Sequence, residues 1–309
     1  MTPVPVIWCF GNRGDRCHGL VEDALAGEFG PTGLTFTHHM DLNSAGISAP
    51  HGILVVSGGV QLDYVAEIEA AVSRLSWALI LITADEETKF DWRRLQGPRR
   101  KIWVQMPCGE KTKGCDRVFP IGYPTGTRQL LRSIGLPSPE APRRYPWCFI
   151  GQMQHQQRRE CIEALGWRKD GGRLSRTGGF AQGYKREDYL REMMQAYLAP
   201  GPAGMYTVDC FRFWEALECG CLPVCDKRHF SQPPSYNYWI DLLGGSPPFP
   251  TVSNWREFAA IADRYMRDPE ALRQDTRAAL AWWGYYKAGL VGWLVQDLKE
   301  LSCNPAGTV

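Results

Sequence analysis

Four short apolar runs alternate with helix-like segments through the first third of the chain, and this alternation limits the possible folds more than any other feature. The runs are residues 4–10, 52–57, 78–83 and 101–106. Residues 61–75 carry apolar side chains at helical spacing between two of these runs, and a shorter helix is predicted over 18–27. Strands that alternate with helices in this way form a parallel sheet covered on both faces by helices. The first half is therefore predicted to be a Rossmann-like α/β domain.

A proline-rich segment, residues 137–146, separates this half from a second one. It holds four prolines in ten residues and is expected to be a semi-rigid linker, because proline fixes φ. A length of 309 residues favours two domains. We expect an N-terminal domain over residues 1–136 and a C-terminal domain over 147–309. The second domain restarts with a strand at Trp147, and its predicted helices cover residues 154–165, 186–196, 254–265, 269–283 and, after an aromatic stretch at 282–286, a last segment to about 301.

Composition excludes several classes of protein. No run of eighteen apolar residues occurs, so no transmembrane helix and no membrane partner are predicted. The N-terminus lacks the basic region of a secretory signal. The 11 cysteines lie mostly inside apolar runs, without paired C-x-x-C motifs or histidines at ligand spacing. These features predict reduced cysteines, no metal site and a cytoplasmic protein.

The charge is unevenly distributed although the net charge is only +2. Residues 89–186 contain about 21 Lys and Arg against 7 Asp and Glu. A basic middle in a nearly neutral protein favours a polyanionic partner or ligand, provided that the bases converge on one surface. The alternative is that they are spread over two domains and paired with the acidic remainder of the chain.

The stretch from Ala199 to Asp226 is predicted to be a Gly/Pro-rich loop, a helix and a strand. Thr207 or Asp209 would be the helix N-cap, and Gly220 would end the helix. A helix N-terminus beside an open loop can bind phosphate, and Arg212 adds a cation suited to a diphosphate. Glu215 and Glu218 could accept hydrogen bonds from sugar hydroxyls. The alternative is a solvated helix face with no ligand.

The same stretch resembles the nucleotide-sugar-binding segment of exostosin-type glycosyltransferases. The shared pattern is P-x-G…D-x-F-R-x-W-E-A-L-E-x-G-C-x-P-V, and two upstream pieces agree with it: residues 147–152 followed by Arg158 and Arg159, and residues 177–180 followed by Tyr189 and the two methionines after it. The resemblance covers about residues 147–226. It implies a GT-B fold, in which two Rossmann-like domains face each other across a cleft and the C-terminal helices cross back to the first domain.

This resemblance implies a donor site for a nucleotide sugar, with a UDP-sugar as the expected co-substrate and no other cofactor. The residues that would bind the donor are Gln152, Arg158, Thr177, Tyr206, Thr207, Asp209, Arg212 and Glu215. The chain contains no D-x-D motif, so arginines and a helix terminus would replace a metal ion in stabilising the leaving diphosphate. The family inverts the configuration of the transferred sugar, which the resemblance implies for this chain.

The acceptor side has weaker candidates, all at expected strand ends of the first domain. Asp85 follows the strand at 78–83 and could be the general base for an acceptor hydroxyl, although it could equally cap a helix. Asn12 and Arg13 follow the first strand, and His38 stands near another strand end. Ligands bind at the carboxyl ends of strands in sheets of this kind, so we expect these three residues to contact the acceptor.

Three functions remain open at this point. Exostosin relatives carry a signal-anchor that this chain lacks, so it would meet its acceptor in the cytosol, or in the host cytoplasm if a phage encodes it. Together with the basic middle, this favours a 5-hydroxymethylpyrimidine base in DNA as acceptor. A cytosolic glycan or lipid-linked acceptor explains the same absence. A non-catalytic nucleotide- or nucleic-acid-binding module would keep the fold and the Arg212 loop but would not need Asp85.

Overall fold

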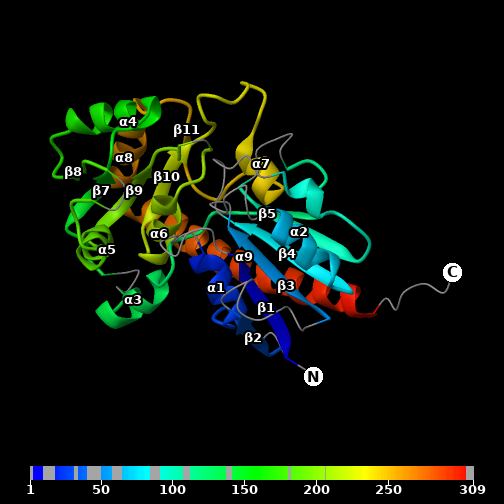
Figure 1. The fold of residues 1–309 in the computed structure, drawn as a ribbon. Helices are drawn as coiled ribbons and strands as arrows, with labels where there is room; N and C mark the ends of the chain where they lie inside the picture. Colours follow the sequence, from blue (N-terminus) through cyan, green and yellow to red (C-terminus); the bar gives the residue numbers. More distant parts are fainter. Residues whose placement is uncertain are drawn as a thin grey trace. The chain divides into compact units, whose positions relative to one another are not determined.

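The structure is a computed structural model of the chain. It describes residues 3–9, 18–30, 34–39, 50–57, 65–83, 91–106, 112–136, 141–179, 182–205 and 207–303, with residues 38, 39 and 57 described by their backbone alone. Two compact units are present: unit 1 comprises Met1–Ile121 and Tyr285–Val309, and unit 2 comprises Gly122–Gly284. Each unit has its own sheet with helices packed on it (Figure 1).

Unit 1 contains a six-stranded sheet in the order β2-β1-β3-β4-β5-β6. Every neighbouring pair of strands is parallel. The strands are β1 (Val4–Cys9), β2 (Phe36–His39), β3 (His51–Ser57), β4 (Trp77–Thr83), β5 (Arg100–Gln105) and β6 (Arg117–Phe119). Its helices are α1 (Gly19–Leu25), α2 (Val65–Ser73) and the short 3₁₀ helix η2 (Trp92–Leu95). The predicted parallel sheet is confirmed, and β4 is buried over its whole length, as expected for a central strand covered on both faces.

Unit 2 contains a five-stranded parallel sheet in the order β11-β10-β9-β7-β8. The strands are β7 (Tyr145–Gly151), β8 (Arg173–Arg176), β9 (Ala196–Gly201), β10 (Leu222–Asp226) and β11 (Thr251–Val252). The helices are α3 (Thr127–Ile134), α4 (Gln156–Gly166), α5 (Arg186–Met194), α6 (Phe211–Glu218), α7 (Tyr238–Leu243) and α8 (Glu257–Arg267). The helix predicted over 186–196 is too long, because Ala196 already pairs in β9.

The strand order gives each sheet one point where the chain reverses its direction of travel. In unit 2 the chain moves from β7 outward to β8 and then returns to place β9 on the other side of β7. In unit 1 the same reversal falls between β1 and β3. Loops that leave neighbouring strands in opposite directions at such a point open a crevice at the carboxyl ends of the strands, where α/β proteins bind ligands.

The division between the units falls at Gly122, before the proline-rich segment that is the linker expected from the sequence. Helix α3 lies between these two points, and its contacts explain the position of the division. Leu131 of α3 belongs to the same hydrophobic cluster as Leu190 of α5 and Ala216 of α6. The segment before the prolines is therefore part of the core of unit 2.

The last helix, α9 (Pro269–Cys303), is continuous over 35 residues. The separate helices predicted on either side of the aromatic stretch are wrong, because Gly284 lies inside the helix without interrupting it. In unit 2 the ring of Trp283 packs 4.6 Å from that of Trp214, measured between centroids, so this part of the stretch is core. From Tyr285 onward the helix belongs to unit 1, as expected for a C-terminal helix that returns to the first domain.

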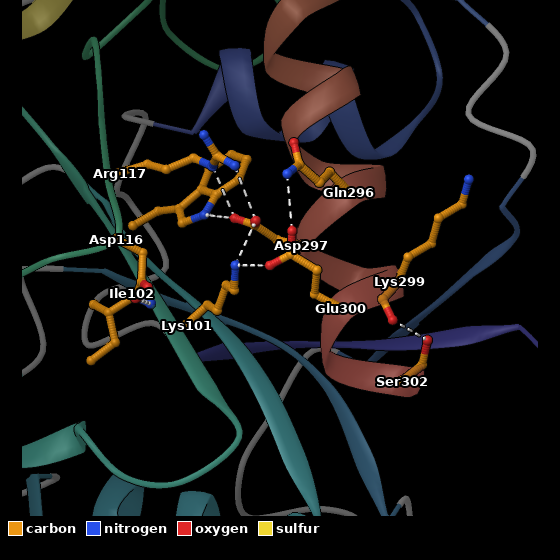
Figure 2. A network of polar contacts seen from close by, with 10 residues as sticks. Lys101, Ile102, Asp116, Arg117, Gln296, Asp297, Lys299, Glu300 and Ser302 are labelled. Atoms are coloured by element: carbon orange, nitrogen blue, oxygen red, sulfur yellow. Dashed lines mark hydrogen bonds and ion pairs between the residues drawn. The ribbon is translucent and has the colours of Figure 1, made fainter. Parts of the chain in front are cut away.

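A buried carboxylate fastens the end of α9 to the sheet of unit 1 (Figure 2). Asp297, whose side chain is 0% exposed, accepts hydrogen bonds from Lys101 (3.0 Å), from Trp103 Nε1 (2.8 Å) and from Arg117 Nε (2.9 Å). Burial alone would raise the pKa of Asp297, but the hydrogen bonds from Arg117, Lys101 and Trp103 outweigh it and hold the pKa below its ordinary value. The carboxylate therefore remains charged and paired inside the unit.

Candidate functional site

The candidate site lies in unit 2, at the carboxyl ends of β7 and β9 where the strand order reverses. Gly151 ends β7 and is followed by Gln152 and the start of α4. Gly201 ends β9 and is followed by a loop that leads into α6. The predicted donor residues on α4, on α6 and in these loops therefore come from neighbouring strand ends, which brings them to one edge of the sheet.

Arg212, the second residue of α6, is held against the end of β7. Its Nε donates to the carbonyl of Ile150 at 3.1 Å, and its guanidinium carbon lies 4.5 Å from the ring centroid of Phe149. Gly151 makes this approach possible, since a Cβ there would lie 2.2 Å from Nη2 of Arg212. Within the described part of the chain, Nη1 of Arg212 is buried and has no hydrogen-bond partner. The structure thus holds a fixed cation with a donor left for an anionic ligand.

Two helices begin beside this cation without side-chain caps. The N-cap of α6 is Cys210 and that of α4 is His155, and neither makes a side-chain hydrogen bond to the helix. Uncapped amides and the positive end of the helix dipole favour an anion such as a phosphate. The predicted N-cap for α6, Thr207 or Asp209, is wrong. The carboxylate of Asp209 is used elsewhere, because it accepts from Trp214 Nε1 and from the Tyr238 hydroxyl.

A buried set of hydrogen bonds fixes the loop after β9. The N–H of Ala203 donates to Asp226 at 2.8 Å, and its carbonyl accepts from Arg158 Nε at 3.2 Å. Burial raises the pKa of Asp226 to about 7 even though the Ala203 N–H opposes the shift. Arg158 is itself 9% exposed, so its position is set by packing as well as by this contact.

His155 contacts the same carbonyl through Nε2, at 2.9 Å from the oxygen of Ala203. A carbonyl can only accept, so Nε2 carries the proton and Nδ1 keeps a lone pair. Burial, assisted by the positive charge of Arg158, lowers the pKa of His155 to about 4, and the ring is therefore neutral at pH 7. Nδ1 of His155 and Oε1 of Gln152 are both buried acceptors that lack a partner among the residues described.

Glu215 lies on α6 and is buried rather than solvated. Its Oε2 accepts from the Tyr189 hydroxyl at 2.9 Å, and Arg186 lies 3.9 Å from Oε1. Burial raises its pKa, while Arg186 and the Tyr189 hydroxyl act against that shift. The alternative prediction, that this face of the helix is exposed to solvent, is therefore wrong at Glu215. The carboxylate of Glu218 already has a partner within the core, since it accepts a hydrogen bond from Trp283 Nε1 at 2.7 Å.

The remaining donor candidates have simpler surroundings. The N–H of Thr177, just after β8, donates to the carbonyl of Gly151 at 3.0 Å, which joins the end of β8 to that of β7. Thr207 is fully buried in the loop before α6. Four candidates, Asn12, Arg13, Asp85 and Tyr206, lie outside the described residues. For His38 only the backbone is described. It lies inside β2, where it pairs with Val6 of β1.

Sequence reasoning missed two residues of this site, His155 and Asp226. Asp226 is the last residue of β10 and His155 lies four residues after the end of β7, and a position at a strand end is the signal that could have found them. Their contacts with the single residue Ala203 could not be read from sequence, because the three residues come from segments that are far apart along the chain.

Among the comparisons with known proteins, only the comparison with solved structures found matches. No protein-family model matches the chain, and no curated protein matches it. The structure is similar to the crystal structure of the β-glucosyltransferase of phage T4 in complex with its UDP-glucose substrate. The TM-score is 0.53 at 12% identity, covering 96% of this chain and 98% of that chain. A second crystal structure is described as the DNA-modifying enzyme β-glucosyltransferase in the presence and absence of uridine diphosphoglucose, and gives a TM-score of 0.52 at 12% identity over 96% and 99% of the two chains.

The chain has the GT-B fold. Two Rossmann-like units with parallel sheets and a long C-terminal helix agree with that assignment. None of the described helices is long and apolar enough to cross a bilayer. Among the described residues, no group of three or more His, Cys, Asp or Glu could hold a metal ion.

Proposed function

We propose that this protein is a glycosyltransferase that moves a sugar from a nucleotide sugar to a hydroxyl group. The observation that carries the proposal is the setting of Arg212, a fixed cation with a free donor beside two uncapped helix N-termini at the reversal point of a GT-B sheet. Such an arrangement suits a diphosphate, which needs several fixed donors and positive charge at one place.

The donor contacts follow from these positions. Arg212 and the amides that open α4 and α6 bind the diphosphate, and Arg158 adds positive charge. Glu215 accepts a hydrogen bond from a hydroxyl of the ribose or the sugar. The rest of the donor is contacted by Gln152, Thr177, Tyr206 and Thr207. Asp209 supports the site by holding Trp214 and Tyr238. The phage T4 protein is described with UDP-glucose as its substrate, which favours a UDP-sugar for this chain.

The reaction needs charge stabilisation and one proton transfer. The acceptor oxygen forms a bond to the anomeric carbon as the bond to the diphosphate breaks, and the negative charge that grows on the diphosphate is stabilised by Arg212 and the helix termini. Asp85 takes the proton from the acceptor hydroxyl as general base. An attack on the face opposite the leaving group inverts the configuration, as in exostosin-type enzymes, whose motif pattern the segment from Trp147 to Asp226 resembles. A metal ion is not required in this scheme.

A hydroxymethylated pyrimidine in DNA is the acceptor that we favour. The similar crystal structure is described as that of a DNA-modifying enzyme, and residues 89–186 of this chain are strongly basic. A glycan or lipid-linked acceptor is the alternative within the same chemistry. A non-catalytic nucleotide-binding module is the alternative of another class, and it would bind the donor without consuming it.

The test is to incubate the purified protein with a panel of nucleotide sugars and either plain DNA or DNA containing 5-hydroxymethylcytosine or 5-hydroxymethyluracil. Nucleoside mass spectrometry should find the mass of one sugar added to the hydroxymethylated base alone. Slow hydrolysis of the donor without modified DNA would support a glycan acceptor. Donor binding without hydrolysis or transfer would indicate the non-catalytic module, and a protein that binds no nucleotide sugar would contradict the proposal.

A further inference from the structure

A polar cavity opens in unit 2 at the loop that follows β10, and Gln157 of α4 donates to the carbonyl of Arg228 in this loop at 2.8 Å. Its volume is about 260 Å³. It lies just beyond the carboxyl ends of β10 and β11, because Lys227 follows Asp226 and Ser253 follows Val252. We call it the 227–253 pocket, and its lining consists of Lys227, Arg228, Pro234, Ser235, Tyr236, Asn237 and Ser253.

The charges around this pocket are of one sign. Lys227 and Arg228 are both exposed, and neither forms a salt bridge with any residue that the structure describes. No Asp or Glu lines the pocket, and residues 227–240 contain none. The carboxylate of Glu257 contacts the lining residue Ser253, but it already accepts hydrogen bonds from the Ser253 N–H at 3.1 Å and from the Asn254 amide at 2.8 Å. The pocket therefore presents two cations without a compensating anion.

The neutral groups of the lining add hydrogen-bond donors. Asn237 uses its side-chain oxygen to cap α7, accepting from the N–H groups of Trp239 and Ile240. Its amide nitrogen is then left as a donor, since a side-chain amide offers both functions. The hydroxyls of Ser235 and Ser253 can donate as well. Two cations and several neutral donors around one cavity are the groups that bind a phosphate.

The surroundings favour a phosphate within a nucleic-acid chain over a free one. The cavity has room for more than a phosphate group, and Tyr236 lines it. Phe230, on the same loop, is 49% exposed although most large apolar side chains of this unit are buried. Basic side chains interleaved with exposed aromatic rings are typical of surfaces that follow a nucleic-acid backbone and stack on its bases or sugars.

We propose that the 227–253 pocket binds a backbone phosphodiester of the nucleic-acid acceptor. This inference rests on the DNA acceptor in the proposed function, and it assigns Lys227 and Arg228 to acceptor binding, separate from the donor contacts of Arg212. Phosphate contacts position a protein on a nucleic acid without reading its sequence. The pocket would accordingly bind plain and hydroxymethylated DNA with the same affinity.

The test compares the full-length protein with the double variant Lys227→Gln/Arg228→Gln and with a matched control, Lys169→Gln/Arg267→Gln, which removes two exposed bases elsewhere in unit 2. Binding of a short labelled duplex is measured by fluorescence anisotropy between about 50 and 200 mM salt, and UDP-glucose binding is measured by calorimetry. Loss of the two cations that contact one phosphodiester should make the negative slope of log K against log salt shallower by about 1 and weaken binding roughly 10-fold at the lower salt. UDP-glucose binding should not change.

Equal DNA affinity and equal slope in the pocket variant and the control would overturn the inference while the proposed function stands. A wild-type protein that binds no DNA at any salt would also overturn it. If UDP-glucose fails to bind the wild type, the proposed function fails instead, and the DNA titrations still decide whether the pocket binds phosphodiesters.

Discussion

The guanidinium carbon of Arg212 lies 4.5 Å from the ring centroid of Phe149, so a residue of α6 is stacked on a residue of β7. The two side chains are far apart in the sequence, and their contact joins β7 to the helix that follows β9, the neighbouring strand at the reversal point of the sheet. A stacked guanidinium keeps its edge free for ligand oxygens and loses little freedom when it binds them. This geometry makes Arg212 the most informative residue for testing the donor site.

Replacing Arg212 by alanine should weaken UDP-sugar binding and leave the protein folded. Loss of a hydrogen bond to a charged group costs about 1.5–3 kcal/mol, which corresponds to roughly 10- to 150-fold in affinity. Calorimetric titration with UDP-glucose measures the change. Arg267→Ala, which removes an exposed arginine from α8, serves as the control and should bind as the wild type does. Equal affinities for the two variants would remove Arg212 from the site.

Adding a single methyl group at Gly151 tests the same site without changing any charge. The Cβ of Gly151→Ala would lie 2.2 Å from Nη2 of Arg212, and the end of that flexible side chain can move away. We expect a folded protein with an appreciably weaker affinity for the donor, because the cation is displaced. Gly166→Ala is the matched control, since a Cβ at that position meets no atom within 4 Å. A donor affinity that is the same in both variants would mean that the position of Arg212 is unimportant.

Asp226 should make the stability of unit 2 depend on pH. Its pKa is about 7 in the folded protein and about 3.9 in an unfolded chain, so the folded protein binds one more proton between these values. The free energy of unfolding should therefore fall as the pH rises from about 4 to 7, by at most about 1.4 kcal/mol per pH unit from this group. Asp226→Asn removes the buried charge and keeps an acceptor for the Ala203 N–H.

Thermal unfolding at several pH values would measure this effect. The variant Asp226→Asn should be more stable than the wild type at pH 8 and similar to it near pH 4. Asp241→Asn, at an exposed aspartate of α7, should follow the wild-type profile. Parallel profiles for Asp226→Asn and the wild type would show that the carboxyl group does not titrate in this range.

Asp297 should contribute strongly to the stability of unit 1. Asp297→Ala leaves Lys101 and Arg117 without their shared buried carboxylate, and breaking a buried ion pair by removing one partner costs about 3–5 kcal/mol. Chemical denaturation followed by tryptophan fluorescence would measure the loss. Glu300→Gln changes an exposed carboxylate that contacts the same Lys101 and should have no measurable effect. If the two variants are equally stable, the buried network does not fasten α9 to the sheet.

Glu215→Gln should weaken donor binding without lowering the stability of the fold. Burial raises the pKa of Glu215, which means that the folded protein disfavours its charge. A glutamine keeps an acceptor for the Tyr189 hydroxyl, so stability at pH 7 should be unchanged or higher, while the donor affinity should fall because a charged acceptor for a hydroxyl is lost. Melting temperatures and UDP-glucose titrations on the same samples measure both effects. A strongly destabilised variant with normal affinity would assign Glu215 to the core alone.

The sequence by itself determined the type of fold and the segments that form it. Apolar runs such as the one that becomes β4 predict buried parallel strands, since a strand covered on both faces must be apolar on both. The pattern around Arg212 and Glu215 also predicted a loop, a helix and a strand, and the structure has α6 and β10 in this order after the loop that follows β9. These features are local, because they depend on the spacing of residues along one segment.

Only the tertiary structure decided what each polar side chain does. Asp209 could have capped a helix, but Trp214 and Tyr238 donate hydrogen bonds to its carboxylate, and the helix begins one residue later than an Asp209 cap requires. His155 and Asp226 both contact Ala203, and α3, which precedes the proline-rich segment, shares a hydrophobic cluster with α5 and α6 of unit 2. Hydrogen bonds and packing between segments far apart in sequence depend on the whole fold, so local spacing cannot predict them.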